Sequence, residues 1–410
     1  MISMAFFEKV GKVRGSIPFM KFLPRKTIHL DHASTTPLDL EVFESMKPYF
    51  TEKFHNPSAL YDDARGARIA VDGARESVAR YLSCRPEEVI FTSGGTESSN
   101  IALRGVLQAI WTQDRTNIPH VITTAFEHPA TLEVCSYLEQ KGWISLTLLV
   151  PNDNGVVTPE MLEKELTEET ALVSCIHTHN ETGIIQPIRA LSRKIQKFKK
   201  EAKSIYPVFH VDASQSPCYV KVQKESLGAD LITLDSSKFY GPKGVGVLFC
   251  KSSVPIEGVY QGGGQEKGLR PGTENVPGIV GLAKALDKAE QLRESESERV
   301  QEIHDFFVQG VQGQILESSI HGIKGEKSPH IVNVCFPGVD SEFLTIQLAS
   351  SGINVSFMTA CRTAGEESES HSIKSFNPEC ARSSIRFSFG RGTKIFEIKK
   401  VLKVLKNLVS

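Results

Sequence analysis

The chain has 410 residues, which is more than a single hydrophobic core usually serves, so we expect two domains. Its 47 basic and 48 acidic side chains nearly cancel, which excludes the long-range field that favours direct binding of nucleic acid or an anionic membrane. No apolar run approaches the roughly eighteen residues of a membrane span, so we expect a soluble protein whose partners are small molecules or proteins.

The eight cysteines include no Cys-x-x-Cys pair, so their spacing predicts neither a zinc site nor a disulfide framework. We therefore expect a reducing compartment, the cytoplasm. Residues 1–26 carry six basic side chains and one acidic one, interleaved with phenylalanines. A transit peptide has a similar pattern but is richer in serine and arginine. We predict an N-terminal extension, residues 1–27, that packs on the smaller domain.

From residue 28 the chain alternates predicted strands and helices, which is typical of an α/β fold. A short strand leads into a turn over residues 29–37, and further strands are expected at 88–92, 120–124, 144–150, 171–176, 209–212, 229–235 and 245–249. Helices are expected over 41–50, 64–82, 101–110, 131–141 and 188–203. A long helix from 280 to about 311 should cross into the second domain, which has strands at 331–336 and 383–389 and helices at 342–350 and 396–408. We predict a large domain over 28–285 and a small α+β domain over 286–410.

A glycine pair follows the predicted strand at 88–92. Gly94, Gly95 and Thr96 stand where that strand gives way to a helix. Backbone N–H groups at such a turn point outward, and the helix dipole favours an anion there. The arrangement fits a phosphate cradle, although an ordinary helix N-cap at Thr96 has the same sequence pattern.

Two later strands deliver polar side chains to the same edge of the predicted sheet. His128 follows the strand at 120–124 and could stack on a planar cofactor, although a single histidine at a strand end is more often structural. His177 and His179 precede Asn180, and no third ligand of suitable spacing accompanies them. We therefore predict no metal site.

Lys238 lies between two apolar strands, an unusual place for a lysine. In one interpretation, Lys238 is an ordinary solvated cation in a loop. In the other, it is a desolvated amine with a lowered pKa that attacks carbonyl groups and forms a Schiff base. Asp212 ends the preceding strand, where a carboxylate can keep the pyridine nitrogen of pyridoxal phosphate protonated. The two residues together favour a pyridoxal phosphate enzyme.

Taken in order, the motifs of this chain closely resemble those of the cysteine desulfurases, over residues 28–410. They are LDHASTTP at 30–37, FTSGGTES at 91–98, EH at 127–128, NETG at 180–183, DASQ at 212–215, KFYGPKG at 238–244 and SIRFS at 384–388. The resemblance implies a fold-type-I pyridoxal phosphate enzyme of the class V aminotransferase group. It implies a homodimer that takes sulfur from L-cysteine, leaves L-alanine and holds the sulfur as a cysteine persulfide.

The resemblance also implies roles for individual residues. Lys238 would form the Schiff base and His128 would stack on the ring and act as acid or base. The other implied contacts are Asp212 to the pyridinium, Gln215 to the phenolic oxygen, Gly95 and Thr96 to the phosphate, and Thr273 to the phosphate of the partner subunit. Ser237, next to the lysine, can also donate to the phosphate. Asn180 and Arg386 would hold the substrate carboxylate. Cys361 would be the nucleophile that receives the sulfur.

The chain departs from the family pattern close to the lysine. Asp235 and Ser237 stand where a serine and a histidine are usual, and Asp235 would repel a phosphate if it pointed inward. Phe357 and Met358 make the approach to Cys361 bulkier than usual. Three hypotheses therefore stay open. They are a cysteine desulfurase that feeds an iron–sulfur scaffold or a tRNA-thiolation protein, a selenocysteine lyase or aminotransferase on the same scaffold, and a catalytically weak assembly protein.

Overall fold

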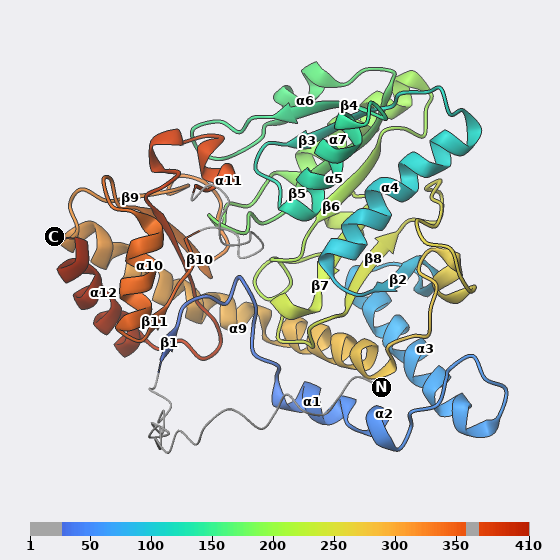
Figure 1. Cartoon of the computed structure of the whole chain (residues 1–410), viewed down its shortest axis with the longest axis horizontal. Helices are drawn as coiled ribbons and strands as arrows, with labels where there is room; N and C mark the ends of the chain where they lie inside the picture. The colour runs from blue at the N-terminus through green and yellow to red at the C-terminus, as the bar shows by residue number, and fades with distance from the viewer. Residues whose placement is uncertain (1–26, 358–368, 410) are drawn as a thin grey trace, which may run out of the picture.

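The computed structural model describes residues 27–357 and 369–409. A seven-stranded sheet has the order β2-β8-β7-β6-β5-β3-β4 (Figure 1). Of these strands only β8 runs against the rest, so the predicted mostly parallel sheet is confirmed. The strands are β2 (Val89–Thr92), β3 (His120–Thr124), β4 (Ser145–Leu149), β5 (Thr170–Ile176), β6 (Val208–Asp212), β7 (Leu231–Asp235) and β8 (Gly246–Cys250).

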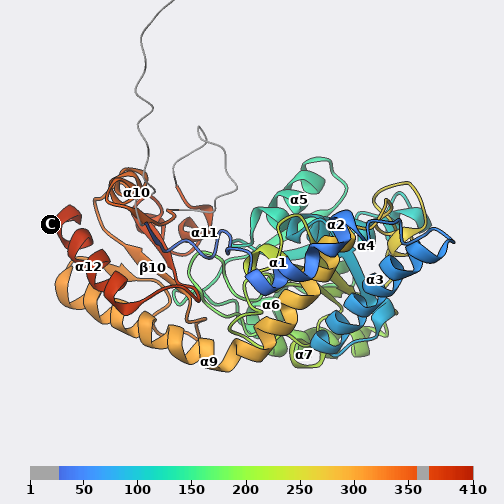
Figure 2. The ribbon, with the colours of Figure 1, turned by 90° about the horizontal axis from the view of Figure 1, so that it is seen from below.

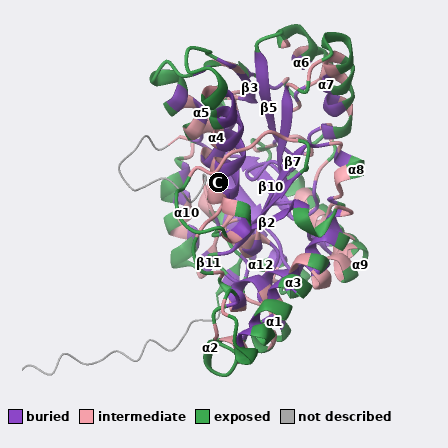
Figure 3. Ribbon diagram, turned by 90° about the vertical axis from the view of Figure 1, so that its right-hand side faces the viewer, coloured by how far each residue is buried: buried purple, intermediate pink, exposed green. Residues whose placement is uncertain are grey.

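Helices cover both faces of this sheet, and its strands are buried except for the edge strand β4, which is partly exposed (Figure 3). Because side chains alternate along a strand, Val89 and Phe91 pack on one face and Ile90 on the other. The face of Ile90 packs against α4 (Gly95–Gln113) and α5 (Pro129–Gln140). The opposite face packs against α3 (Asp62–Leu82), α6 (Pro159–Glu165), α7 (Ile188–Ala202) and the start of α9 (Val276–Gln314).

Two short helices replace the single one predicted over 41–50. They are α1 (Leu40–Met46) and α2 (Pro48–Thr51), and the break falls at Pro48, which has no N–H to continue the first helix. The sequence pattern also did not predict α6 or α8 (Lys224–Leu227), which are short and have few buried residues. Most of the other predicted elements appear within a few residues of their expected ends.

Helix α9 connects the two parts of the molecule, and it runs along the base of both in Figure 2. The smaller part has an antiparallel sheet of order β12-β10-β9 and a parallel pair, β1 with β11. Ile28 and Leu30 pack into its core, although the sequence assigns residues from 28 onward to the large domain. Its elements are β1 (Ile28–His29), β9 (Ser319–Ile320), β10 (Ile331–Cys335), β11 (Ile353–Asn354), β12 (Ser384–Ser388), α10 (Ser341–Ser350), α11 (His371–Lys374) and α12 (Ile395–Val409).

The N-terminal extension predicted over 1–27 falls almost wholly outside the described residues. Within the described ranges, no helix is both long enough and apolar enough to cross a membrane.

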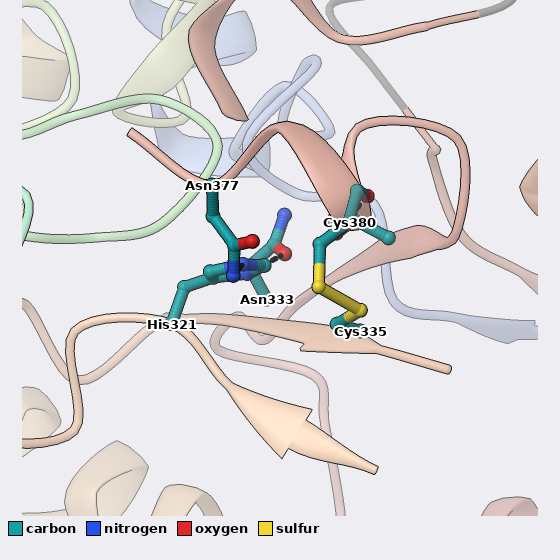
Figure 4. The surroundings of a disulfide bond; sticks show 6 residues. His321, Asn333, Cys335, Asn377 and Cys380 are labelled. Carbon is teal, nitrogen blue, oxygen red and sulfur yellow. Dashed lines mark hydrogen bonds between the residues drawn. A yellow bond between two sulfur atoms is a disulfide. The ribbon is translucent and has the colours of Figure 1, made fainter. Parts of the chain in front are cut away.

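A disulfide joins Cys335, at the end of β10, to Cys380, and their Cα atoms are 5.6 Å apart (Figure 4). The spacing of the cysteines, which predicts no disulfide framework, did not reveal this disulfide. Spacing could not reveal this pair, because the two residues lie 45 positions apart and meet only when β10 and β12 align. Beside the disulfide, the His321 ring lies 2.8 Å from Asn333 Oδ1 and 3.2 Å from Asn377 Nδ2.

Reduction of this disulfide should destabilise the small domain. A cross-link that closes a loop of this length lowers the entropy of the unfolded chain, which corresponds to about 2–4 kcal/mol of stability. We expect urea unfolding to shift to lower concentration when a dithiol reductant is added. In the double variant Cys335→Ala/Cys380→Ala, the reductant should have no effect. Equal midpoints for the wild-type protein with and without reductant would count against a stabilising disulfide.

Candidate active site

The carboxyl ends of five strands of the large sheet surround a cavity of about 120 Å³. Strand ends at this edge are where open α/β sheets bind ligands. The structure brings eight of the predicted site residues to this cavity, namely Gly95, Thr96, His128, Asn180, Asp212, Gln215, Lys238 and Arg386. Ser34, Ser214 and Asp235 also line it and were not assigned a site role from the sequence.

Lys238 is placed by a short 3₁₀ turn, η2 (Ser236–Lys238), that directly follows β7. Its ammonium group donates a hydrogen bond to the carbonyl oxygen of Ser34. The loop that carries Ser34 is itself held to η2, because Thr36 donates to the Ser237 carbonyl from its N–H at 2.8 Å and from its hydroxyl at 2.9 Å. The lysine amine is therefore fixed inside the cavity between two segments about 200 residues apart in the chain.

Asp212 ends β6 and is 6% exposed. Its Oδ1 accepts hydrogen bonds from the Ser214 N–H at 3.0 Å and the Ser214 hydroxyl at 2.6 Å. Burial raises the pKa of this carboxyl, and the bonds from Ser214 only partly oppose the rise. A cationic N–H placed in the cavity would therefore stabilise the ionised form of Asp212.

His128 caps the N-terminus of α5, and its Nδ1 accepts a hydrogen bond of 3.1 Å from the Ala130 N–H. Burial, and then the nearby charge of Lys238, lowers the pKa of His128 to about 4. The imidazole is therefore neutral at pH 7. Because Nδ1 is an acceptor, the neutral ring carries its proton on Nε2.

The predicted cradle is present at the start of α4. Gly94 has φ +149°, a backbone conformation that glycine adopts readily and other residues rarely do. At Gly95 a Cβ atom would lie 3.3 Å from atoms of Asp235 and Ser214, so a side chain there would crowd the cavity. The Gly95 N–H donates to Asp235 Oδ2 at 3.1 Å, which shows that an anion fits this position.

Arg386 lies on β12 of the small domain and reaches across to the large one. Its Nη1 donates to the Asn180 carbonyl at 2.9 Å, and its Nη2 donates to Asp31 and to the Ser34 hydroxyl, both at 2.7 Å. Arg386 Nε and Asn180 Oδ1 are buried without a hydrogen-bond partner among the described residues. Buried polar atoms are nearly always paired, so these two indicate that a ligand belongs in the cavity.

Two of the predicted site residues, Ser237 and Thr273, do not line this cavity, and a third falls outside the described residues. The Ser237 hydroxyl donates to Asp235 Oδ1 at 2.7 Å. Thr273 lines a separate cavity of about 120 Å³ near the start of α9. Cys361 lies outside the described residues.

Residues 28–401 match the family model for class V aminotransferases. The chain belongs to this family. It is 38% identical over 387 residues to the cysteine desulfurase IscS of Dictyoglomus turgidum, which covers 94% of this chain and 95% of that relative. It is 36% identical to the putative cysteine desulfurase IscS 1 of Bacillus subtilis, over 93% of this chain and 98% of the relative.

Comparison with solved structures supports the same family assignment for this class V aminotransferase. A NifS-like protein superposes with a TM-score of 0.84 at 32% identity, over 93% of this chain and 99% of that one. The structure described as SspA in complex with cysteine has a TM-score of 0.75 at 30% identity, over 88% of this chain and 99% of that one. The predicted fold-type-I architecture is confirmed.

Class V aminotransferases depend on pyridoxal phosphate, and the cavity residues fit that cofactor. Lys238 supplies the amine that would hold its aldehyde carbon, and Asp212 supplies the buried carboxylate that would face its ring nitrogen. Gly95 and Thr96 supply N–H groups at a helix N-terminus for the phosphate. Asn180 and Arg386, each with a buried atom that has no hydrogen-bond partner among the described residues, also line the cavity.

Glu127, next to His128, makes the free energy of unfolding of the protein depend on pH. Its side chain is fully buried, Oε1 accepts from the Ile176 N–H at 2.7 Å and the Thr124 hydroxyl at 2.9 Å, and burial raises its pKa from 4.5 to about 8. The folded state thus binds the proton more tightly than the unfolded state does. The stability that this proton contributes is complete below about pH 4.5 and is lost as the pH rises through about 8.

We therefore expect Glu127→Gln to be more stable than the wild-type protein above pH 8. The advantage should grow between pH 5 and 8 and reach up to about 5 kcal/mol, at about 1.4 kcal/mol per pKa unit. Urea unfolding at a series of pH values measures it. Glu133→Gln, which changes an exposed carboxylate on α5, should follow the wild-type curve. Parallel curves for the wild-type protein and Glu127→Gln would show that Glu127 is ionised in the folded state.

Proposed function

We propose that this protein is a pyridoxal phosphate-dependent cysteine desulfurase, which takes sulfur from L-cysteine and releases L-alanine. The observation that carries the proposal is the pair of buried, unpartnered atoms, Arg386 Nε and Asn180 Oδ1, in the cavity that holds Lys238. A guanidinium N–H in that place suits the carboxylate of an amino acid. Relatives named cysteine desulfurase, and a structural neighbour described with cysteine, support the choice of substrate.

Arg386 and Asn180 orient the substrate. Two of the three guanidinium nitrogens already bond to Asn180, Asp31 and Ser34, which fixes the plane of the group before substrate arrives. Nε has no hydrogen-bond partner among the described residues, so the guanidinium group keeps one donor that a substrate carboxylate could use. This preorganisation favours binding of the substrate carboxylate in the cavity that Lys238 also lines.

Lys238 and His128 move protons in this scheme. Pyridoxal phosphate supplies an electron-withdrawing ring that stabilises negative charge at the substrate Cα. Asp212 would pair with the protonated ring nitrogen of the bound cofactor, and that cation would in turn favour the ionised form of the buried carboxylate. Lys238 Nζ, as the neutral amine, would take the Cα proton, and the neutral His128 ring, which also lines the cavity, carries a proton on Nε2.

A cysteine thiolate must receive the sulfur, and the described cysteines do not suit that role. Burial raises the thiol pKa of Cys84, Cys135, Cys175, Cys218 and Cys250, and Cys335 and Cys380 form the disulfide. Of the eight cysteines, this leaves Cys361, the one in the family motif. Its thiolate attacks the substrate sulfur, a new S–S bond forms as the Cβ–S bond breaks, and the bonding electron pair stays on Cβ and takes up a proton to give alanine.

Product analysis tests this function. The holoenzyme is incubated with L-cysteine and a thiol reductant, and we expect alanine and sulfide in equal amounts. A keto acid without sulfide would instead establish an aminotransferase. Turnover of selenocysteine but not of cysteine would establish a selenocysteine lyase. Bound cofactor with no turnover of either would establish a weak assembly protein.

We further propose a cytoplasmic homodimer that passes its sulfur to an acceptor protein of iron–sulfur cluster assembly or tRNA thiolation. Thr273 supports the dimer, because it follows a glycine-rich loop and does not line the cavity of its own chain, as expected of a residue that serves the partner subunit. The name IscS of the relatives supports the sulfur-transfer role. Sedimentation equilibrium of the holoenzyme tests the dimer, and a monomer at micromolar concentration would contradict it.

A further inference from the structure

The carboxylate of Asp235 lies on the donors of the phosphate cradle. Its Oδ2 accepts from the Gly95 N–H at 3.1 Å, at the N-terminus of the 19-residue helix α4. Its Oδ1 accepts from the Ser237 N–H at 2.9 Å and the Ser237 hydroxyl at 2.7 Å. The family resemblance assigns Gly95 to the phosphate, and Ser237 can also donate to it from a position where the family usually has a histidine, so one side chain of this chain engages both.

The Asp235 carboxylate and a cofactor phosphate, both negatively charged, would compete for the Gly95 N–H. The start of a helix carries a partial positive charge that stabilises one anion, and Gly95 has a single N–H to donate. A phosphate that binds there must either displace the Asp235 carboxylate or lie within a few ångströms of it. At that separation like charges repel noticeably even near a protein surface. Two cations line the cavity, Lys238 and Arg386, and Arg386 already pairs with Asp31 at 2.7 Å.

We propose that Asp235 is an intramolecular competitor for the cofactor phosphate and sets how tightly this enzyme retains pyridoxal phosphate. The proposal rests on the cofactor dependence in the proposed function. In the ligand-free protein the Asp235 carboxylate accepts the hydrogen bonds of the Gly95 and Ser237 N–H groups. On binding, the phosphate replaces the carboxylate at Gly95, and the loss of that bond together with the remaining repulsion weakens affinity. Retention thus depends on the surrounding cofactor concentration more than it would with a neutral residue at this position.

The test compares two ligands that differ only in the phosphate. Dissociation constants of pyridoxal phosphate and of pyridoxal are measured by equilibrium absorbance titration of the cofactor-stripped full chain. Asp235→Asn keeps the side-chain shape and an oxygen for the Ser237 N–H but removes the charge. We expect its dissociation constant for pyridoxal phosphate to fall at least tenfold, with that for pyridoxal changed less than twofold. Glu133→Gln, the loss of an exposed charge on α5, should change neither.

The outcomes are distinct. An unchanged or larger dissociation constant of Asp235→Asn for pyridoxal phosphate would overturn the proposal, because Asp235 would then serve only to cap η2. Parallel changes for both ligands would overturn it as well, because the effect would not be on the phosphate. If Asp235→Asn does not fold, Asp235→Ser, whose hydroxyl can also accept from the Ser237 N–H, is measured in its place. Substrate is absent throughout, so failure to release sulfide from cysteine leaves this result unaffected and bears on the proposed function alone.

Discussion

Lys238→Ala is expected to reduce alanine formation from L-cysteine at least about a thousandfold, since the change removes both the covalent anchor of the cofactor and the base at Cα. The amine is held in the cavity by the Ser34 carbonyl, and Asp212 lines the same cavity. Borohydride treatment of the wild-type holoenzyme should fix the cofactor on the peptide that contains Lys238. In Lys238→Ala no peptide should carry it.

Lys243→Ala is the matched control for this change. Lys243 also binds the 31–36 loop, through a bond of 2.7 Å to the Thr36 carbonyl, but it does not line the cavity. Its replacement tests whether loss of a loop contact alone stops turnover, and we expect activity within about tenfold of the wild-type protein. Retention of more than a tenth of wild-type activity by Lys238→Ala would contradict the assignment.

Cys361→Ser should abolish sulfide release in the presence of reductant while leaving cofactor binding unchanged. A serine hydroxyl cannot accept sulfur as a persulfide, whereas the proton transfers at Lys238 do not need the thiol. We expect turnover of selenocysteine to fall less, because selenium is expelled more easily than sulfur. Absorbance of the bound cofactor and assays of alanine and sulfide measure these effects.

Cys84→Ser is the control for that experiment. Cys84 is partly buried, and burial together with Glu88 raises the pKa of its thiol to about 12, so it is not a thiolate at neutral pH. We expect wild-type sulfide release from this variant. Full alanine production from cysteine by Cys361→Ser would require a mechanism without a persulfide on that residue.

Much of the fold follows from the sequence because the spacing of apolar residues in the helices and the apolar runs of the strands are both clear. The inner strands of the large sheet are buried on both faces and form short apolar runs in the sequence, and polar residues that follow the parallel strands lie at one edge of the sheet. That is why Asp212 and Lys238 could be paired from sequence alone. The disulfide could not be predicted, because Cys335 and Cys380 meet only through the pairing of β10 with β12.

Eight of the predicted site residues line one cavity, but the contacts between its residues could not be predicted. Sequence identifies Asp235 as a departure, yet the direction of its carboxylate depends on how closely α4 approaches the end of β7. Ser34 was missed as a site residue because its contribution is a backbone carbonyl and a hydroxyl, brought to Lys238 and Arg386 by the loop after β1. Ser237 was predicted to bind phosphate, and in the structure its hydroxyl instead donates to Asp235.

The most direct test of desulfuration is to locate the transferred sulfur. The holoenzyme is mixed with L-cysteine without reductant, its thiols are alkylated, and its peptides are analysed by mass spectrometry. We predict one additional sulfur atom on the peptide that contains Cys361, in an amount equal to the alanine released in the first turnover. Alanine without protein-bound sulfur, or an additional sulfur on the peptide of another cysteine, would contradict the account.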